Sequence, residues 1–185
     1  MNKAWLAALV LFSSVYGLEK LDPKYQIAYG NPDAETKIVE YFSLSCPKCV
    51  EWVLDEFPEL DLEKTSFVFH PVPADLLTLQ AMVCLERLAP PQKKLFFETA
   101  MKLLPGIDPA EKSVLLEEAM EALGAPMPDL GKMEFLEKTG AFQDAFRFLS
   151  QEGGIDAIPA MEVNGALSEK YPTRELIDSL TKRSS

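Results

Sequence analysis

The stretch "EYFSLSCPKCVEW", residues 40–52, holds Cys46 and Cys49, two of the three cysteines in this chain of 185 residues. The overlapping segment "KIVEYFS" is β-branched and aromatic, which is typical of a strand buried on both faces. Ser45 is a favourable residue to cap a helix, and Pro47 is tolerated in a first helical turn because no backbone N–H is needed there. The pattern predicts a strand that leads directly into a helix ending near residue 60, with both cysteines at the junction.

This junction favours a reactive pair of thiols. Cys46 is expected at the helix start, where free N–H groups and the macrodipole stabilise negative charge, and Lys48 adds a cation nearby. Both favour thiolate over thiol. Cys49 follows one turn later, close enough to form a disulfide with Cys46. We therefore expect Cys46 to attack and Cys49 to resolve the mixed disulfide.

The rest of the chain predicts a sheet with a helical block between its parts. The segment "TSFVFHPV", residues 65–72, reads as a second buried strand, and strand–helix–strand is the unit that builds a parallel sheet. From residue 74 to about 152 the pattern is helical. The segment "AMEVNGALSE" then predicts a hairpin with a type I′ turn at Asn164-Gly165, and a last helix follows with Thr173 as its cap.

One helix of the block is predicted to bury a stripe of apolar side chains. Residues at positions i, i+3, i+4 and i+7 lie on one face of a helix, and such a stripe is most often core packing. The stripe consists of Phe142, Ala145, Phe146 and Leu149.

Composition and the first residues bear on location and partners. Hydrophobic residues make up 48% of the chain, typical of a globular protein, and a net charge of −11 argues against nucleic acid as a partner. "MNKAWLAALVLFSSVYG" has the layout of a signal peptide, with Lys3 before a nine-residue apolar run that is too short to span a bilayer. We expect cleavage near Gly17 and a periplasmic or otherwise extracytoplasmic location, where disulfides persist. An uncleaved anchor is the alternative.

Two segments carry a resemblance to a known family. "GNPDAETKIVEYFSLSCPKC" and "GGIDAIPAMEVNGALSEKYPTRELIDSL" resemble the active-site and closing segments of the DsbA-like branch of the thioredoxin superfamily. The resemblance implies an α/β thioredoxin-like fold formed by residues 18–73 and 153–185, with a helical subdomain inserted at 74–152 after the signal peptide at 1–17.

The resemblance also implies an activity. It is that of a thiol:disulfide oxidoreductase without a cofactor or metal, acting through Cys46, Pro47, Lys48 and Cys49. The expected substrates are cysteines of envelope proteins, and a membrane redox partner would reset the dithiol. Too little chain precedes the first core strand for an N-terminal dimerisation domain, so we expect a monomer.

Three further residues gain roles from the resemblance. Pro159 is expected to be cis beside the dithiol, which leaves the backbone of Ile158 free to pair with a substrate strand. Glu40 is expected to relay protons to the buried cysteine. A lone Glu in an apolar strand is costly unless it is partnered or protonated, although a solvated position at an edge is the alternative.

Two positions depart from the pattern of DsbA-like oxidases. Lys48 stands where these oxidases commonly have His, and Ile158 stands where they often have Val. Lys keeps a positive charge but lacks the geometry of an imidazole and its titration near neutral pH. A disulfide reductase or isomerase on the same scaffold therefore stays open.

Other readings of the same residues lead to different functions. Cys46, Cys49, Cys84 and His70 are an allowed set of zinc ligands, although Cys84 and His70 belong to no ligand-spaced pair. Cys84 is otherwise a buried inert thiol or a second redox centre, and His70 a core or loop residue or a catalytic one. A chaperone-like binding module without enzymatic activity is a further alternative.

Overall fold

The computed structural model describes residues 22–107, 111–150, 155–168 and 170–183, so the predicted signal peptide lies outside the described residues. A five-stranded sheet has the order β1-β3-β2-β4-β5. The strands are β1 (Ile27–Gly30), β2 (Thr36–Phe42), β3 (Thr65–Pro71), β4 (Ala160–Val163) and β5 (Ala166–Ser168). This is the mixed α/β class that the sequence predicts.

The connection from β2 to β3 confirms the predicted strand–helix–strand unit. β2 and β3 pair in parallel, and α1 (Pro47–Asp55) and the short 3-10 helix η2 (Phe57–Glu59) join them. The helix is shorter than predicted, because Pro58 has no N–H with which to continue the α-helical ladder.

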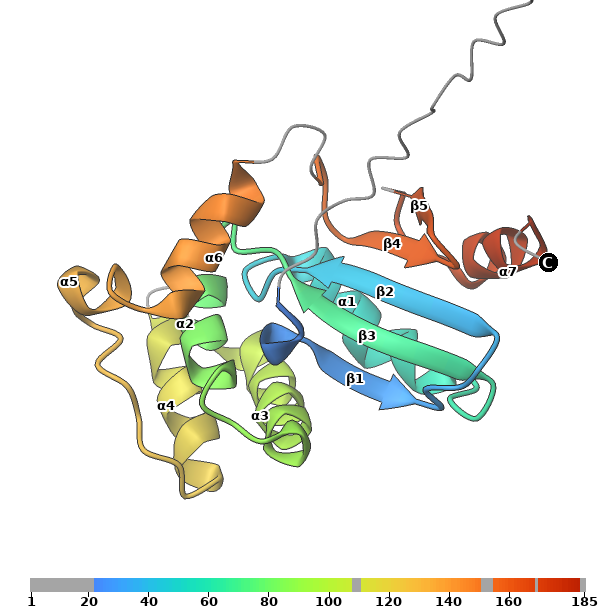
Figure 1. The fold of residues 1–185 in the computed structure, drawn as a ribbon. Helices are drawn as coiled ribbons and strands as arrows, with labels where there is room; N and C mark the ends of the chain where they lie inside the picture. The colour runs from blue at the N-terminus through green and yellow to red at the C-terminus, as the bar shows by residue number, and fades with distance from the viewer. Residues whose placement is uncertain (1–21, 108–110, 151–154, 169, 184–185) are drawn as a thin grey trace, which may run out of the picture.

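The remaining helices lie in two places (Figure 1). Five follow β3 and gather to one side of the sheet, and α7 (Arg174–Arg183) lies beside β4 and β5. The five are α2 (Leu76–Leu85), α3 (Pro90–Leu103), α4 (Lys112–Ala122), α5 (Met133–Leu136) and α6 (Gly140–Leu149), and two further 3-10 turns are η1 (Pro23–Tyr25) and η3 (Leu104–Gly106). None of the helices in the described part of the chain is long and apolar enough to cross a membrane.

An aromatic core fixes α1 and α3 against the sheet. The ring of Trp52 on α1 stacks on Phe67 of β3 at 5.6 Å between centroids, and its indole N–H donates to the carbonyl of Pro172 at 2.7 Å. Phe97 of α3 lies 4.5 Å from Phe69 and 5.3 Å from Phe42. Such large buried rings contribute much of the hydrophobic stabilisation, and they hold the start of α1 in place.

The predicted apolar stripe of α6 is wrong. Phe146 is 69% exposed and Leu149 is 54% exposed. The buried residues are Ala141, Ala145 and Phe148. The two small alanines on this face allow close packing with α2, and Phe148 lies 5.5 Å from the ring of His70, so the helix is rotated relative to the prediction.

The closing segment follows the prediction. Asn164 and Gly165 both have positive φ, 46° and 86°, as a type I′ turn between β4 and β5 requires. Thr173 caps α7, because its hydroxyl accepts the N–H of Leu176 at 3.3 Å.

Candidate active site

The sheet topology brings three segments that are distant in the sequence to the same end of the central strands. β2 and β3 are parallel and end together, with Phe42 opposite Pro71. β4 is antiparallel to β2 and begins at the end where β2 and β3 stop, with Ala160 opposite Tyr41. The turn after β2, the segment after β3 and the segment before β4 therefore meet where the dithiol lies.

Cys46 occupies the N-cap of α1, where Ser45 was expected, so that part of the prediction is wrong. Its Sγ accepts the backbone N–H of Cys49 at 3.2 Å, and Pro47 is the first helical residue. The sulfur is half-buried and lies 3.8 Å from the carbonyl oxygen of Ile158. An N–H donor and a helix N-terminus thus face the sulfur of Cys46, and both stabilise negative charge.

Cys49 differs from Cys46 in its access to solvent. It is fully buried, and burial raises the pKa of its thiol well above the usual range. The hydrogen bond with Cys46 also raises this pKa, whereas a backbone hydrogen bond from Ser43 lowers it. The outer sulfur is therefore the accessible one, and the inner sulfur is reached only from within the protein.

Glu40 lies in the middle of β2 and is fully buried, so the solvated edge position considered for it is wrong. Neither carboxyl oxygen has a hydrogen-bond partner among the described residues. Burial raises the pKa of this carboxyl well above its usual value, and the charge of Cys46 raises it further. Burial thus favours the neutral form of Glu40, which interacts electrostatically with both cysteines.

The ammonium group of Lys48 pairs with an acidic side chain and not with the dithiol. Its ammonium is exposed and pairs with Glu51 at 2.7 Å, and it also lies 5.6 Å above the ring of Tyr171. The hydrogen bond and charge of Glu51 raise the pKa of Lys48, so the side chain stays cationic. The expected support of the Cys46 thiolate by Lys48 is weakened accordingly.

Ile158 and Pro159 border the dithiol from the opposite side. The bond between them is cis, as the resemblance implies. A hollow of about 440 Å³ adjoins them, lined by Lys48, Glu51, Ile158, Pro159 and Tyr171. Ile158, which lines this hollow, has its carbonyl oxygen 3.8 Å from the sulfur of Cys46.

A polar network that no sequence pattern predicted lies behind the dithiol. Asp75 caps α2 and accepts hydrogen bonds from the hydroxyls of Ser43, Ser45 and Thr78. The spacing Asp75-x-x-Thr78 before an apolar run is a cap signal, but only the parallel pairing of β2 and β3 places the cap beside Ser43.

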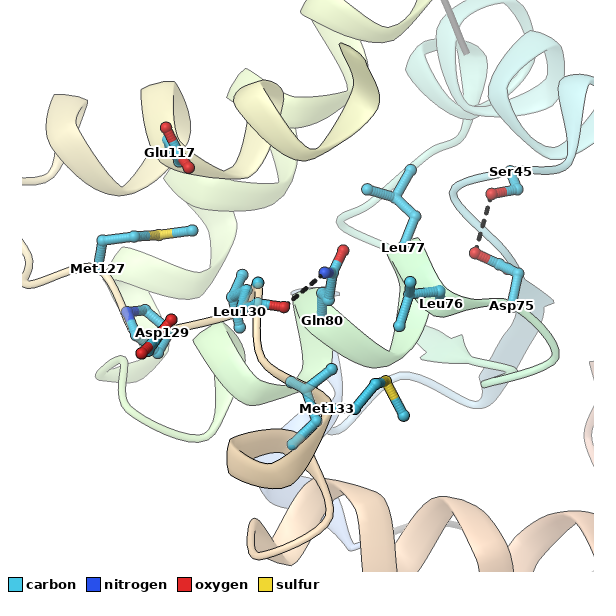
Figure 2. Close-up of a pocket in the computed structure, with 13 residues that line it drawn as sticks. Ser45, Asp75, Leu76, Leu77, Gln80, Glu117, Met127, Asp129, Leu130 and Met133 are labelled. Atoms are coloured by element: carbon cyan, nitrogen blue, oxygen red, sulfur yellow. Dashed lines mark hydrogen bonds between the residues drawn. The ribbon is translucent and has the colours of Figure 1, made fainter. Parts of the chain in front are cut away.

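Asp75 and Ser45 also stand at the rim of a cleft of about 710 Å³ (Figure 2). The cleft runs between α2, α4 and the segment 127–136. Asp129 of that segment lines it as well, with its carboxylate paired to Lys132 at 2.7 Å.

Cys84 and His70, which the zinc and second-centre alternatives require, are buried in the core. Burial raises the pKa of the Cys84 thiol to about 12, which is typical of an inert thiol. His70 is buried between the rings of Tyr41 and Phe148, and its Nδ1 lies 3.0 Å from the carbonyl of Pro71. Within the described residues, no three His, Cys, Asp or Glu side chains are grouped to hold a metal ion.

Comparison with known proteins places this geometry in a family. Residues 22–182 match a family model described as thioredoxin, and no curated protein matches the chain. Among solved structures, oxidised BdbD from Bacillus subtilis is 21% identical, with 89% of this chain and 95% of that chain covered and a TM-score of 0.65.

Two other solved structures are similar to a comparable degree. DsbA from Chlamydia trachomatis is 21% identical, covering 86% of this chain and 91% of its own, with a TM-score of 0.60. The catalytic domain of Proteus mirabilis ScsC is 15% identical, covering 87% and 89%, with a TM-score of 0.59. At these identities the similarity is one of fold. Since the family match spans nearly all of the described residues, the chain belongs to the thioredoxin family and has the fold of its DsbA-like members.

Proposed function

We propose that this protein is a thiol:disulfide oxidoreductase that exchanges disulfides with cysteines of other proteins through Cys46 and Cys49. The observation that carries the proposal is the sulfur of Cys46 at the N-cap of α1, accepting the N–H of Cys49 at 3.2 Å. A half-exposed sulfur with a buried sulfur one turn behind it is the arrangement that thiol–disulfide exchange needs.

The exchange has two steps that balance in either direction. A substrate thiolate attacks Cys46 in the Cys46–Cys49 disulfide, so a substrate–Cys46 bond forms and Cys49 leaves as a thiolate. A second substrate thiolate then attacks the substrate sulfur, releasing a substrate disulfide and the reduced dithiol. In the reverse direction the thiolate of Cys46 opens a substrate disulfide, and Cys49 then attacks Cys46 to release the substrate.

Glu40 is suited to move the proton of Cys49. Burial raises the pKa of both groups, so each prefers its neutral form. When Cys49 leaves as a thiolate, the neutral carboxyl of Glu40 supplies a proton, and when Cys49 attacks, the carboxylate of Glu40 takes the proton back. A water molecule would complete this transfer wherever the two side chains do not touch.

The surroundings of Lys48 bear on the direction of exchange. A Cys–Cys disulfide is a strong oxidant when the dithiol that forms on its reduction is stabilised. Here Lys48 stands where oxidases commonly have His, and its charge is paired with Glu51. This observation favours a milder couple, so reductase or isomerase activity is the second candidate.

The remaining parts of the proposal concern place and partners. We propose export by the leader at 1–17, action on envelope proteins in the periplasm or an equivalent compartment, and a membrane redox partner that resets the dithiol. The segment 74–152 would act as an inserted helical subdomain, Ile158 and Pro159 would contact the substrate, and the protein would work as a monomer without a cofactor.

A thiol count tests the core of the proposal. The protein is purified in air, and its free thiols and mass are measured before and after reduction, followed by equilibration with glutathione. We expect a reversible Cys46–Cys49 disulfide with Cys84 untouched, loss of exchange in Cys46→Ser, and normal exchange in Cys84→Ser. Stoichiometric zinc without a redox cycle would instead support the metal reading, and suppression of aggregation by Cys46→Ser would support a binding module.

A further inference from the structure

The cleft of about 710 Å³ includes Ser45, the residue directly before Cys46. The hydroxyl of Ser45 donates to Asp75 on the rim at 2.8 Å. The cleft shares no lining residue with the hollow at Ile158 and Pro159. A substrate chain bonded to Cys46 can reach the cleft within a few residues, since an extended chain covers about 3.4 Å per residue.

One wall of the cleft is fixed to α2 by a buried hydrogen bond. The side-chain amide of Gln80 donates to the carbonyl of Leu130 at 3.0 Å, and both residues are buried. Figure 2 shows this bond as a dashed line between α2 and the segment 127–136. The wall is therefore in place before a partner binds, which lowers the entropy cost of binding.

Apolar side chains that line the cleft are exposed to solvent. Leu76 of α2 is 52% exposed and Met133 of α5 is 50% exposed, and the partly buried Met127 lines the same cleft. Single exposed apolar residues are common on protein surfaces, but a group in one cleft indicates a binding surface. Methionine side chains are flexible and polarisable, so they adapt to partners of different shape.

The charge of the cleft is negative. Its charged lining residues are Asp75, Glu117 and Asp129, and no Lys, Arg or His lines it among the described residues. Glu117 is exposed on α4, whereas Asp129 is balanced by Lys132 at 2.7 Å. Such a cleft attracts a cation and repels an anion, most strongly at low ionic strength.

We propose that the cleft is a second substrate subsite, which binds an apolar side chain flanked by Lys or Arg in the chain next to the substrate cysteine. The inference rests on the proposed function, because the substrate is the chain held in mixed disulfide with Cys46. The apolar side chain would contact Leu76, Met127 and Met133, and the cation would lie towards Glu117. The subsite adds selectivity and takes no part in the exchange of bonds.

The test measures how fast short cysteine peptides open the Cys46–Cys49 disulfide of the oxidised protein. One peptide carries Leu flanked by Lys beside its cysteine, a second carries Leu flanked by Glu, and a third carries Ser flanked by Lys. Each is made with these residues before or after the cysteine. Neighbouring charges also change the reactivity of the peptide thiol, so each ratio of rates is divided by the ratio found with the neutral bis(2-hydroxyethyl) disulfide.

Two variants of the cleft have matched controls. Glu117→Gln removes an acid from the cleft, and Glu118→Gln is its control, because Glu118 is exposed on α4 but does not line the cleft. Met133→Ala removes apolar contact, and Leu95→Ala is its control, because Leu95 is 49% exposed on α3 and lies outside the cleft. All four side chains are exposed, so the core stays intact.

For wild type at low salt, we expect the Leu–Lys peptide to react about tenfold faster than the Leu–Glu peptide, and added salt should lower this ratio. Glu117→Gln should lower it by about two- to fivefold, the range for an exposed charge pair. Met133→Ala should lower the preference for Leu over Ser by about three- to fivefold, the effect of roughly one methylene of contact. Both controls should keep the wild-type ratios.

Other outcomes overturn the inference. Equal rates for all peptides would remove the selectivity, and an equal effect of Glu118→Gln and Glu117→Gln would assign it to net charge. Unchanged ratios in Glu117→Gln and Met133→Ala would place the selectivity elsewhere, and a dimer that these variants dissociate in sedimentation would make the cleft an interface between two copies. If wild type forms no reversible disulfide, the proposed function itself has failed, and the subsite with it.

Discussion

Two carboxyl groups lie near the dithiol, and they differ in burial and in hydrogen bonding. Glu40 is fully buried in the central strand with no hydrogen-bond partner for either oxygen among the described residues. Asp75 is only partly buried, and its oxygens accept three hydroxyls and one backbone N–H. Burial therefore raises the pKa of Glu40, while hydrogen bonds lower that of Asp75.

The difference shows that position alone does not decide the chemistry of an acid near a reactive thiol. A carboxyl group without donors in an apolar strand keeps its proton and is able to give it away. A carboxylate saturated with donors holds no proton, and it serves as an anchor. The surroundings of the dithiol thus contain one acid that is suited to proton transfer and one that is suited to holding the turn at residues 43–45.

The largest expected effect concerns proton transfer by Glu40. Glu40→Gln keeps the size of the side chain but has no titratable proton, so Cys49 must exchange its proton with water. We expect the step that uses Cys49 to slow by roughly 100-fold, the lower end of the range for general acid–base catalysis. Stopped-flow measurement of substrate release from a Cys46 mixed disulfide checks this, and a rate within twofold of wild type would remove Glu40 from the mechanism.

The second effect is on the pH dependence of stability. The pKa of Glu40 is raised in the folded state from an ordinary value of 4.5, so above that value the unfolded chain has lost a proton that the native protein keeps. Stability then falls as pH rises towards the folded pKa, by at most about 1.4 kcal/mol per pH unit for one proton. Urea titrations of Glu40→Gln should lack this slope, and an identical slope in both proteins would contradict the neutral state of Glu40.

The third effect concerns the cap that Asp75 provides to α2 and the hydroxyls that it accepts. Asp75→Ala removes the cap of α2 and leaves three hydroxyls without their acceptor, so we expect a loss of about 2 kcal/mol in unfolding free energy. Asp75→Asn keeps the cap and should lose less than about 1 kcal/mol. Because the pKa of Asp75 is lowered, the loss in both variants should be full above pH 3.8 and should shrink as pH falls through the folded pKa.

The smallest expected effect is that of replacing Lys48, and this variant serves as a control for the variants of Glu40 and Asp75. Lys48→Met removes an exposed cation that is paired with Glu51, not with the dithiol. We expect the rate of Cys46 alkylation to change by less than about twofold, as is usual for exposed ion pairs. A much larger loss would restore Lys48 as a direct partner of Cys46.

Much of the fold was predictable because it depends on local patterns. The buried strands β2 and β3, the hairpin at Asn164-Gly165 and the capped helix after Thr173 are each encoded within a few neighbouring residues. The stripe on α6 was mispredicted because apolar residues at 141, 142, 145, 146, 148 and 149 allow two overlapping faces. Only the packing partner of α6 decides between them, and local periodicity does not contain that information.

The parts of the candidate site that depend on neighbouring residues were also predictable. The pattern around Cys46 and Cys49 indicated the dithiol, and the cap position was wrong by one residue, since the sulfur itself caps the helix. The network of Asp75 joins residues more than thirty positions apart. Its existence depends on the register of two parallel strands, which no single segment specifies.

The sulfur that caps α1 is also the sulfur that must react. A neutral disulfide sulfur is a weaker hydrogen-bond acceptor than a thiolate. The hydrogen bond from the Cys49 N–H to the Cys46 sulfur is therefore weaker in the oxidised form than in the reduced form. We expect the hydrogen-exchange rate of the Cys49 amide to report the redox state. The backbone amide that reports the redox state is three covalent bonds from the sulfur of the inner thiol.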